Sequence, residues 1–358
     1  MRALRIHKNQ IVRVENVDKP SLENDKVLVK VAACGICGSD IPRVLNNKAH
    51  YYPIILGHEF SGVVEDVGLD IKNVKIGDHV VCAPLIPCGI CEDCLNGNYS
   101  LCKNYRFIGS SLQGAMAEYV SIPERNIVKI PEDIDLIDAC MVEPVSVALH
   151  ALKQNNHIQG KKVAVFGMGT IGSILIQVVK AVGADLVTAF VRNNKYDDML
   201  HNMGVKSIVY TNSDTWIQDA CIETQNRGYD FVYETAGSAD TIKQSIEVVG
   251  NKGKICCIGT PKKSLTISVE LWEKINRKEC YITGSWMSYS YPFPGEEWVK
   301  AVDYLEHGIV NIYDSMINSK TYIDDAENVF DSFKNNGTVS GRKIIVMDKE
   351  LVGNTTPK

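Results

Sequence analysis

The sequence predicts an α/β protein in which a doubly wound parallel sheet is joined to a second, mostly β domain. Two patterns predict this fold. From about Gly160 onward, short apolar stretches alternate with stretches of helical periodicity, which is typical of parallel strands connected by crossover helices. Before Gly160, β-like stretches are separated by turns marked by Gly and Pro. With 358 residues, of which 45% are hydrophobic, the chain is long enough to bury two cores.

The amino-terminal part, residues 1–155, is expected to form the mostly β domain. It contains little helical periodicity. Its clearest predicted strands cover residues 27–33, 61–67, 78–82 and 117–122.

The doubly wound domain is expected over residues 156–285. Six apolar stretches predict its strands, at residues 162–166, 186–190, 207–210, 230–234, 254–258 and 281–284. Because six strands complete such a sheet, we assign residues 286–358 to the first domain again. This last part is predicted to contain amphipathic helices at 299–307 and 325–334, a final strand at 343–347 and a frayed end at 354–358.

The composition excludes several classes of function. The chain has 38 Lys and Arg against 43 Asp and Glu, a net charge of -5, and no basic stretch is concentrated enough to indicate a nucleic-acid partner. No uninterrupted apolar stretch reaches the roughly 18 residues that a membrane span needs, and the amino terminus carries no export signal. We therefore expect a soluble cytoplasmic protein.

Four cysteines lie close together in the sequence as Cys88, Cys91, Cys94 and Cys102, with the spacing C-x2-C-x2-C-x7-C. Four thiolates at this spacing can close a tetrahedral shell around zinc, which leaves no open position and indicates a structural ion. Disulfides are disfavoured because a reducing cytoplasm opposes them. An iron–sulfur cluster uses similar spacing and is the more serious alternative.

A second set of metal-binding residue types is formed by Cys37, His58 and Glu59. One thiolate, one imidazole and one carboxylate make a three-ligand zinc site whose fourth position can take water or a substrate oxygen. Taken singly, each residue also has an ordinary structural interpretation: a small buried cysteine, a core histidine and a surface carboxylate.

The stretch Gly167-Met168-Gly169-Thr170-Ile171-Gly172 has the form G-x-G-x-x-G. It follows a predicted strand and opens a predicted helix that runs to Ala181, which is the setting of a Rossmann dinucleotide-binding loop. The alternative is a glycine turn that serves the fold alone.

The next predicted strand is followed by Val191, Arg192 and Asn193, where an NAD-binding domain usually places a carboxylate. Without that carboxylate a 2′-phosphate is not repelled, and Arg192 offers a guanidinium to bind it. NADP(H) is therefore favoured over NAD(H). The alternative is that Arg192 is a solvated surface residue.

Four motifs in this order resemble those of zinc-containing medium-chain dehydrogenases over essentially the whole chain: Cys37-Gly38-Ser39-Asp40, Gly57-His58-Glu59-Phe60-Ser61-Gly62, the four-cysteine loop and the glycine loop. The resemblance implies a GroES-like fold for the first domain. It also implies that the catalytic zinc is held by Cys37, His58 and Glu143, with Glu59 beside the ion and able to exchange with Glu143.

The same resemblance assigns roles to the neighbours of the zinc ligands. Asp40 would hold the second nitrogen of His58 and fix its tautomer. Ser39 would accept the proton of the substrate alcohol as a relay. Family members with a histidine three residues after this serine pass the proton on through it, whereas this chain has Pro42; Glu59 and ordered water are the candidates for that step.

Two further stretches, Ala49-His50-Tyr51-Tyr52-Pro53-Ile54 and Gly284-Ser285-Trp286-Met287 with Tyr289 and Ser290, resemble the polyol-phosphate members of the family. The resemblance implies oxidation of galactitol 1-phosphate to tagatose 6-phosphate, and an assembly of two or four copies. Substrate hydroxyls would meet polar side chains, and the phosphate would meet a cation; the candidates are His50, Tyr51, Tyr52, Ser110, Tyr289 and Ser290 for hydroxyls, and Arg43 and Lys48 for the phosphate.

Two alternatives to this function stay open. A dehydrogenase of a free polyol such as sorbitol, or of threonine, would share every metal and cofactor motif. A zinc- and dinucleotide-binding regulator without enzymatic activity would also keep them, and it would tolerate replacement of Cys37 or Glu143.

Overall fold

The computed structural model describes residues 1–155, 157–336 and 341–353. The chain divides into two compact units, Met1–Ser146 with Ser288–Lys358, and Val147–Met287. The sequence-based boundaries were placed after residues 155 and 285. Residue 156 and the end at 354–358, expected to be frayed, lie outside the described residues.

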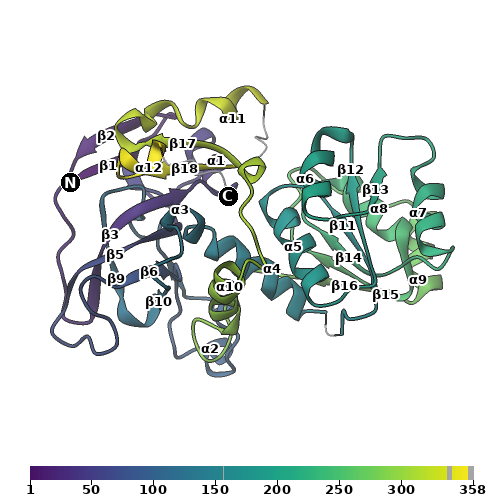
Figure 1. The fold of residues 1–358 in the computed structure, drawn as a ribbon, viewed down its shortest axis with the longest axis horizontal. Coiled ribbons are helices and arrows are strands. Elements are labelled where there is room, and N and C mark those ends of the chain that lie inside the picture. The colour runs from purple at the N-terminus through teal and green to yellow at the C-terminus, as the bar shows by residue number, and fades with distance from the viewer. Residues whose placement is uncertain (156, 337–340, 354–358) are drawn as a thin grey trace. The chain divides into compact units, whose positions relative to one another are not determined.

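The first unit is built on a mixed sheet, antiparallel except for the parallel pair of its last two strands, and its longest strand is β3 (Lys26–Gly35). It pairs with β5 (Glu59–Val67), β9 (Tyr119–Pro123) and, from the far end of the chain, β18 (Arg342–Val346). The rest of this sheet consists of β6 (His79–Cys82), β10 (Ile127–Lys129) and β17 (Ile317–Tyr322). The carboxyl-terminal segment therefore completes the sheet that the amino-terminal segment begins (Figure 1).

Two small sheets and several short helices complete this unit. The sheets contain β1 (Arg2–Ile6), β2 (Val12–Asn16) and β4 (Ile54–Ile55) in one case, and β7 (Leu85–Ile86) and β8 (Arg106–Phe107) in the other. The helices are α1 (Asp40–Leu45), α2 (Glu92–Leu95), α3 (Leu136–Ala139), α10 (Glu296–Glu306), α11 (Asp331–Asn336) and α12 (Glu350–Gly353). Helix α4 (Val142–Lys153) begins in this unit and ends in the next.

The single helix expected at 325–334 is wrong. The structure has a 3-10 helix at Ile323–Asn328, followed by the separate helix α11. The buried residues Ile323, Ala326 and Val329 are spaced by three, the repeat that a 3-10 helix aligns on one face. The Val329 N–H accordingly donates to the Ala326 carbonyl, three residues back.

The second unit contains a six-stranded sheet that is parallel throughout, in the order β13-β12-β11-β14-β15-β16. Its strands are β11 (Lys162–Phe166), β12 (Leu186–Val191), β13 (Ser207–Tyr210), β14 (Tyr229–Glu234), β15 (Val249–Cys257) and β16 (Tyr281–Gly284). Its helices are α5 (Thr170–Ala181), α6 (Asp197–Asn202), α7 (Trp216–Thr224), α8 (Ala239–Val248) and α9 (Val269–Lys278). This strand order is that of a doubly wound dinucleotide fold, so the expected fold class is confirmed.

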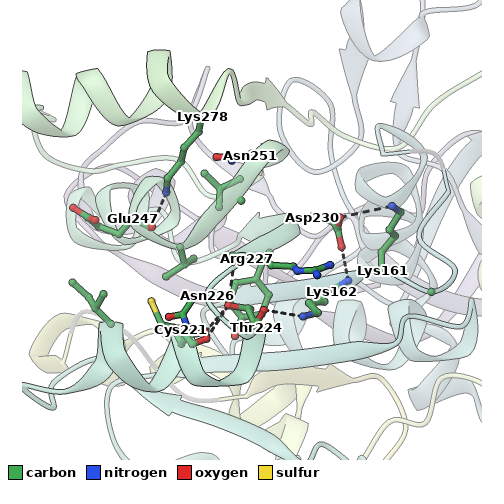
Figure 2. Close-up of a pocket in the computed structure, with 18 residues that line it drawn as sticks. Lys161, Lys162, Cys221, Thr224, Asn226, Arg227, Asp230, Glu247, Asn251 and Lys278 are labelled. Atoms are coloured by element: carbon green, nitrogen blue, oxygen red, sulfur yellow. Dashed lines mark hydrogen bonds and ion pairs between the residues drawn. The ribbon is translucent and has the colours of Figure 1, made fainter.

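A pocket of about 740 Å³ lies at the edge of this sheet where β11, β14 and β15 begin (Figure 2). Two of its lysines bind the carbonyl groups at helix ends. Lys162 Nζ donates to the Thr224 carbonyl at the end of α7, and Lys278 Nζ donates to the Ile246 and Glu247 carbonyls near the end of α8. Cations at these positions stabilise the negative ends of helices, so these two lysines serve the fold. The glycine loop lies at the opposite edge, after the end of β11.

No helix among the residues that the structure describes is long and apolar enough to cross a bilayer.

Candidate active site and metal centres

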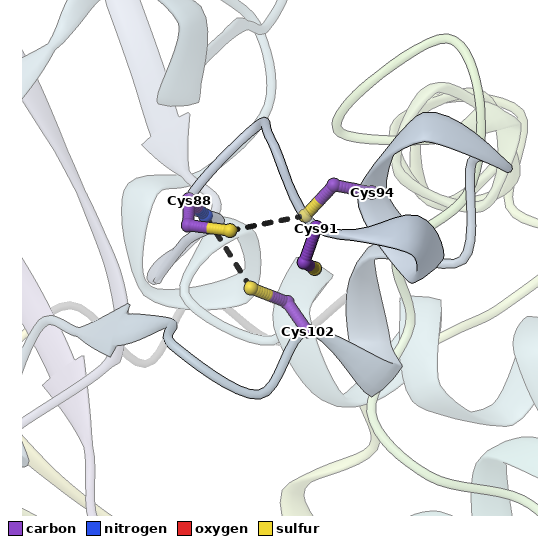
Figure 3. Close-up of side chains that lie close together, drawn as sticks. All are labelled: Cys88, Cys91, Cys94 and Cys102. Carbon is purple, nitrogen blue, oxygen red and sulfur yellow. Dashed lines mark hydrogen bonds between the residues drawn. The ribbon is translucent and has the colours of Figure 1, made fainter.

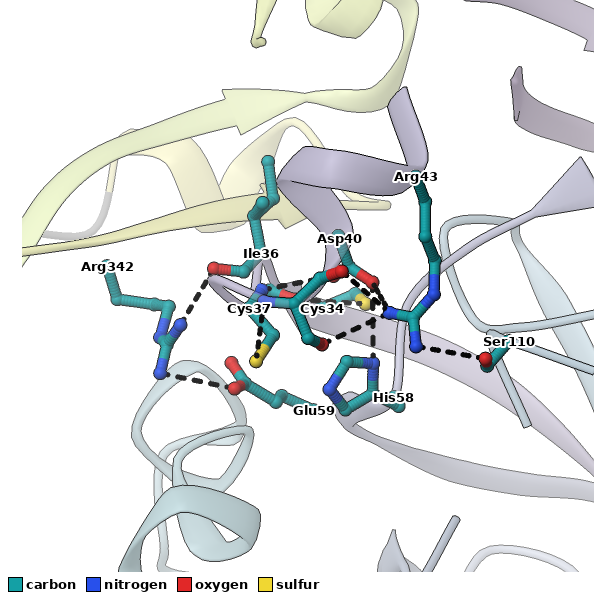
Figure 4. Close-up of polar contacts among 11 residues, drawn as sticks. Cys34, Ile36, Cys37, Asp40, Arg43, His58, Glu59, Ser110 and Arg342 are labelled. Atoms are coloured by element: carbon teal, nitrogen blue, oxygen red, sulfur yellow. Dashed lines mark hydrogen bonds and ion pairs between the residues drawn. The ribbon is translucent and has the colours of Figure 1, made fainter. Parts of the chain in front are cut away.

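The first candidate metal site forms where β3 ends and β5 begins. Gly35 pairs with Glu59 in the antiparallel register, so the loop that carries Cys37 leaves β3 directly beside His58 and Glu59. One ligand atom from each of Cys37, His58 and Glu59 lies within 4.8 Å of the others (Figure 4). The structure thus brings Cys37 together with two adjacent residues, His58 and Glu59, that lie 21 and 22 positions further along the sequence.

Unsatisfied polar atoms mark this cluster as suited to a cation. Glu59 Oε2 is buried and has no hydrogen-bond partner; His58 Nδ1 also lacks a hydrogen bond, but it faces Asp40 at 3.6 Å, which leaves Nε2 for a cation. Burial, and next the charge of Glu59, raise the pKa of Cys37 to about 12. Buried polar atoms without a partner are costly, and a metal ion would supply a partner for several of them at once. The donor set of sulfur, nitrogen and oxygen is one that zinc accepts.

Glu143 lies at the start of α4 and is close enough to the cluster to be influenced by it. Burial, and then the charge of Glu59, raise its pKa to about 8. Its carboxylate is not part of the group of ligand atoms that lie within 4.8 Å of one another. Of the two glutamates, Glu59 is therefore the one grouped with Cys37 and His58 in this structure.

Asp40 and Ser39 lie at the amino-terminal end of α1. Asp40 is fully buried, and its carboxylate accepts the Cys37 N–H at 3.1 Å. Its other oxygen is 3.6 Å from His58 Nδ1, which is an ion-pair separation and longer than a hydrogen bond. Ser39 is exposed, and its N–H donates to Cys37 Sγ at 3.5 Å.

Arg342 is a member of this site that the sequence analysis missed. It begins β18, its guanidinium lies 3.1 Å from Glu59 Oε1, and it donates to the Ile36 carbonyl at 2.8 Å. It therefore holds one oxygen of Glu59 and leaves the other free. Gly35 lets Glu59 approach so closely, because a Cβ at that position would lie 2.6 Å from Glu59 Oε2.

The four cysteines Cys88, Cys91, Cys94 and Cys102 also converge (Figure 3). Their sulfur atoms all lie within 4.8 Å of one another, and the Cys88 and Cys94 sulfurs are 3.9 Å apart. Two sulfurs bound tetrahedrally to one zinc at 2.3 Å are about 3.8 Å apart, whereas a disulfide needs about 2.05 Å. The spacing suits a single ion. Hydrogen bonds from the Ile90 and Cys91 N–H groups lower the pKa of Cys88 to about 6, which favours the thiolate.

The glycine loop joins β11 to α5. Gly167 has a positive φ of 93°, and a Cβ at Gly172 would lie 1.8 Å from the Gly167 carbonyl oxygen, so the turn itself requires both glycines. At Gly169 an added Cβ would meet nothing within 4 Å. The fold itself therefore does not require glycine at position 169. A bound pyrophosphate would require it, because the pyrophosphate must come close to the backbone there. Gly169 is the N-cap, and Thr170 and Ile171 form the first turn of α5.

A second element missed by the sequence analysis supports this loop. Thr235 Oγ1 donates to the Phe166 and Gly167 carbonyls at 2.9 and 3.0 Å. The Glu234 carboxylate accepts the N–H groups of Ala236 and Gly237 at 3.0 and 2.9 Å. The end of β14 therefore holds the loop in place.

Val191 is buried at the end of β12, and Arg192 follows it on the surface. Asn193 then caps the next turn by accepting the Lys195 N–H at 3.1 Å.

The candidate substrate-binding residues differ in burial and in the partners that they already have. Tyr52 and Ser290 bind protein groups, since Tyr52 donates to the Arg43 carbonyl and Ser290 donates to Glu297. Tyr289 is buried, and its ring stacks on Trp298 with centroids 5.9 Å apart. His50, Tyr51 and Lys48 are exposed. Arg43 and Ser110 contact the candidate metal site and each other.

Comparisons with known proteins identify the family of this chain. The model of the alcohol dehydrogenase GroES-like domain matches residues 23–132, and that of the zinc-binding dehydrogenases matches residues 170–306. Galactitol 1-phosphate 5-dehydrogenase of Escherichia coli is 38% identical over 292 residues, 81% of this chain and 84% of that one. Sorbitol dehydrogenase of Bacillus subtilis is 29% identical over 317 residues, 87% of either chain.

Solved structures show the same likeness. The crystal structure of galactitol-1-phosphate dehydrogenase from Escherichia coli covers 97% of this chain and 100% of its own, with a TM-score of 0.91 and 34% identity. A putative zinc-binding dehydrogenase from Sinorhizobium meliloti, bound to NADP, covers 96% of this chain and 98% of its own, with a TM-score of 0.86 and 28% identity.

Proposed function

The chain belongs to the zinc-binding medium-chain alcohol dehydrogenase family and is an oxidoreductase, and from that premise we propose that it oxidises galactitol 1-phosphate to tagatose 6-phosphate with NADP as the hydride acceptor. The convergence of Cys37, His58 and Glu59 on one point is the observation that carries this proposal. The relatives that act on polyols and their phosphates support the substrate class.

Cys37, His58 and either Glu59 or Glu143 would hold the catalytic zinc. When bound, zinc supplies a Lewis acid that lowers the pKa of a hydroxyl held next to it. Because Arg342 binds one oxygen of Glu59, that carboxylate can turn between the guanidinium and the metal site without leaving a charge unpaired. Asp40, with a carboxylate oxygen 3.6 Å from His58 Nδ1, would hold that nitrogen and fix the ring.

Ser39 would accept the proton of the substrate hydroxyl as a relay and pass its own hydroxyl proton to ordered water or Glu59. A bound nicotinamide cofactor would supply the acceptor for the hydride of the carbinol carbon, whose C–O single bond would become a carbonyl. The second zinc would be held by the four cysteines and would stabilise the fold, since a closed thiolate shell leaves no position for a substrate.

The cofactor would bind along the glycine loop, with its pyrophosphate at the start of α5. Arg192 would bind the 2′-phosphate, since it follows β12 where an NAD-binding domain carries an acidic residue.

We also propose that the protein works as a homo-oligomer. Within the described part of the chain, β16 pairs with β15 alone and ends the parallel sheet. Its residues Tyr281 and Ile282 are 54% and 49% exposed, which is unusual for apolar side chains on a sheet edge. Such an edge invites pairing with another chain, here the same edge of a second copy.

A steady-state screen tests the function. Galactitol 1-phosphate, sorbitol and threonine are compared as substrates with NAD and NADP, and tagatose 6-phosphate is used in the reverse direction. The expected result is the highest kcat/KM for galactitol 1-phosphate with NADP. A higher value for sorbitol or threonine would contradict the phosphate assignment, and no turnover of any alcohol by zinc-loaded protein would favour the regulator.

A further inference from the structure

Arg43 joins two hydroxyl groups at the edge of the candidate active site (Figure 4). One of its terminal nitrogens donates to Ser39 Oγ at 3.1 Å, to the Ser39 carbonyl at 3.0 Å and to Asp40 at 3.1 Å. The other donates to Ser110 Oγ at 2.9 Å. The Arg43 side chain is 19% exposed; its bonds to Asp40 and Ser110 are partly buried, whereas its bonds to Ser39 are exposed to solvent. A planar guanidinium holds both groups in a fixed relation.

The contacts between Arg43 and Ser39 fix the orientation of the Ser39 hydroxyl group. Ser39 is itself exposed, and a free serine side chain rotates among three rotamers. The bond from Arg43 occupies one lone pair of Oγ and selects one rotamer. The remaining lone pair can accept a proton from a bound substrate. Ser39 lies one helical turn before Arg43, so the contact between the two residues is local to α1.

Ser110 comes to the same guanidinium from a different part of the chain. Its N–H donates to the Phe107 carbonyl, and the Phe107 ring packs edge-on against His58 with centroids 5.4 Å apart. Ser110 is 4% exposed, which leaves little freedom to its hydroxyl group. The turn that carries it is therefore anchored against a candidate zinc ligand.

We propose that Arg43 is a positioning residue that presents the Ser39 and Ser110 hydroxyl groups together to two neighbouring hydroxyls of a polyol. Ser39 meets the hydroxyl that is oxidised, and Ser110 meets the one on the adjacent carbon. The site thereby selects vicinal diols over simple secondary alcohols. This inference rests on the proposed dehydrogenase function and adds the substrate feature that the site reads.

The test uses a matched pair of probes, butane-2,3-diol and butan-2-ol, which differ by one hydroxyl group. The selectivity, the kcat/KM for the diol divided by that for butan-2-ol, is measured for the wild type and for Arg43→Ala, Arg43→Lys and Ser110→Ala. Loss of one hydrogen bond to a substrate hydroxyl lowers the selectivity about tenfold, so Ser110→Ala is expected to show this loss mainly in the KM for the diol. Arg43→Ala is expected to show the same loss of selectivity and, in addition, a lower kcat for the diol.

Added guanidinium ion is expected to restore diol turnover to Arg43→Ala, and not to Arg43→Ala combined with Ser39→Ala. Arg43→Lys should recover less, because an ammonium group cannot hold two hydroxyls in a fixed plane. Arg13→Ala, a change at an exposed arginine of β2, serves as the control. Zinc content by elemental analysis is measured for every variant, and it should equal that of the wild type.

Three results would overturn the inference. The first is a selectivity of Arg43→Ala within twofold of the wild type, and the second is no rescue of Arg43→Ala by guanidinium. The third is loss of zinc from Arg43→Ala, since Arg43 would then act on the metal ligands. The outcome is separable from the proposed phosphate substrate. If the wild type prefers sorbitol to galactitol 1-phosphate, the phosphate assignment fails and the selectivity test stands; if the wild type oxidises no alcohol, both fail.

Discussion

Replacing Arg342 with methionine should destabilise the protein by a large and specific amount. The Arg342 side chain is 9% exposed and its partner Glu59 is 1% exposed, and their charged atoms are 3.1 Å apart. Arg342→Met keeps most of the side-chain volume and removes the charge, which leaves a buried carboxylate without a partner. Removal of one member of a buried ion pair costs about 3–5 kcal/mol.

Thermal unfolding measures this cost. For a domain of this size, about 1 kcal/mol shifts the melting temperature by roughly 2–4 °C, so a drop of about 6–20 °C is expected. The double variant Arg342→Met with Glu59→Gln should recover most of the loss, because the lone carboxylate is then gone. Zinc should reduce the loss in the single variant, since the ion gives Glu59 another positive partner.

The reasoning would be refuted by a drop below about 2 °C in the metal-free Arg342→Met protein, or by a double variant whose loss equals the sum of the two single losses. The first result would mean that water reaches Glu59. The second would mean that Arg342 stabilises the protein through its bond to the Ile36 carbonyl alone.

Four further outcomes are expected. Ser39→Ala should lower kcat about 10²–10⁴-fold at unchanged zinc content, because a positioned proton acceptor contributes that much; an effect on KM alone would argue against this role. Arg192→Gln should raise the KM for NADP about 10–100-fold and leave that for NAD unchanged, as for a lost charged hydrogen bond of about 1.5–3 kcal/mol; equal changes for both cofactors would exclude it from binding the 2′-phosphate. Cys91→Ser should remove about one zinc per chain and lower the melting temperature, whereas Cys221→Ser, outside both clusters, should retain both metal and stability by elemental analysis and calorimetry. Asp78→Asn should cost about 1 kcal/mol at pH 7 in urea unfolding, and this cost should shrink in acid. Burial alone would raise the pKa of Asp78, but Lys129 at 2.8 Å and the Lys75 N–H outweigh it and lower the pKa, so the stabilisation is present above the unfolded pKa of about 3.9 and is lost as the pH falls through the lower folded pKa. A loss that does not change with pH would contradict this.

Much of the fold could be predicted because its strands are apolar and regularly spaced. The stretches expected at 162–166, 207–210 and 281–284 match β11, β13 and β16 residue for residue. Strands β1 and β2 were missed, since Arg2, Arg5 and Arg13 interrupt their apolar pattern. These arginines lie at the sheet surface, where Arg2 and Arg5 bind Glu118 and Glu15. Only tertiary pairing reveals such strands.

The candidate site was predictable as a set of residue types and unpredictable as a set of contacts. Motif order pointed to Cys37, His58 and Glu59, and the antiparallel register of β3 and β5 is what brings them together. Arg342 carried no motif, and the carbonyl that it binds is 306 positions away, at Ile36. No local pattern reports a contact over that distance.

Charge balance explains why these residue types occur together. With Cys37 as a thiolate, four side chains at this site bear a negative charge when ionised, and two guanidinium groups face them; the acids are Cys37, Asp40, Glu59 and Glu143, and the cations are Arg43 and Arg342. A divalent cation would make the sum zero. In the metal-free protein, protons replace it, which is why burial and the nearby carboxylate raise the pKa of Cys37 to about 12 and that of Glu143 to about 8. Each arginine pairs with a different acid: Arg342 pairs with Glu59, and Arg43 pairs with Asp40 and also donates to Ser39.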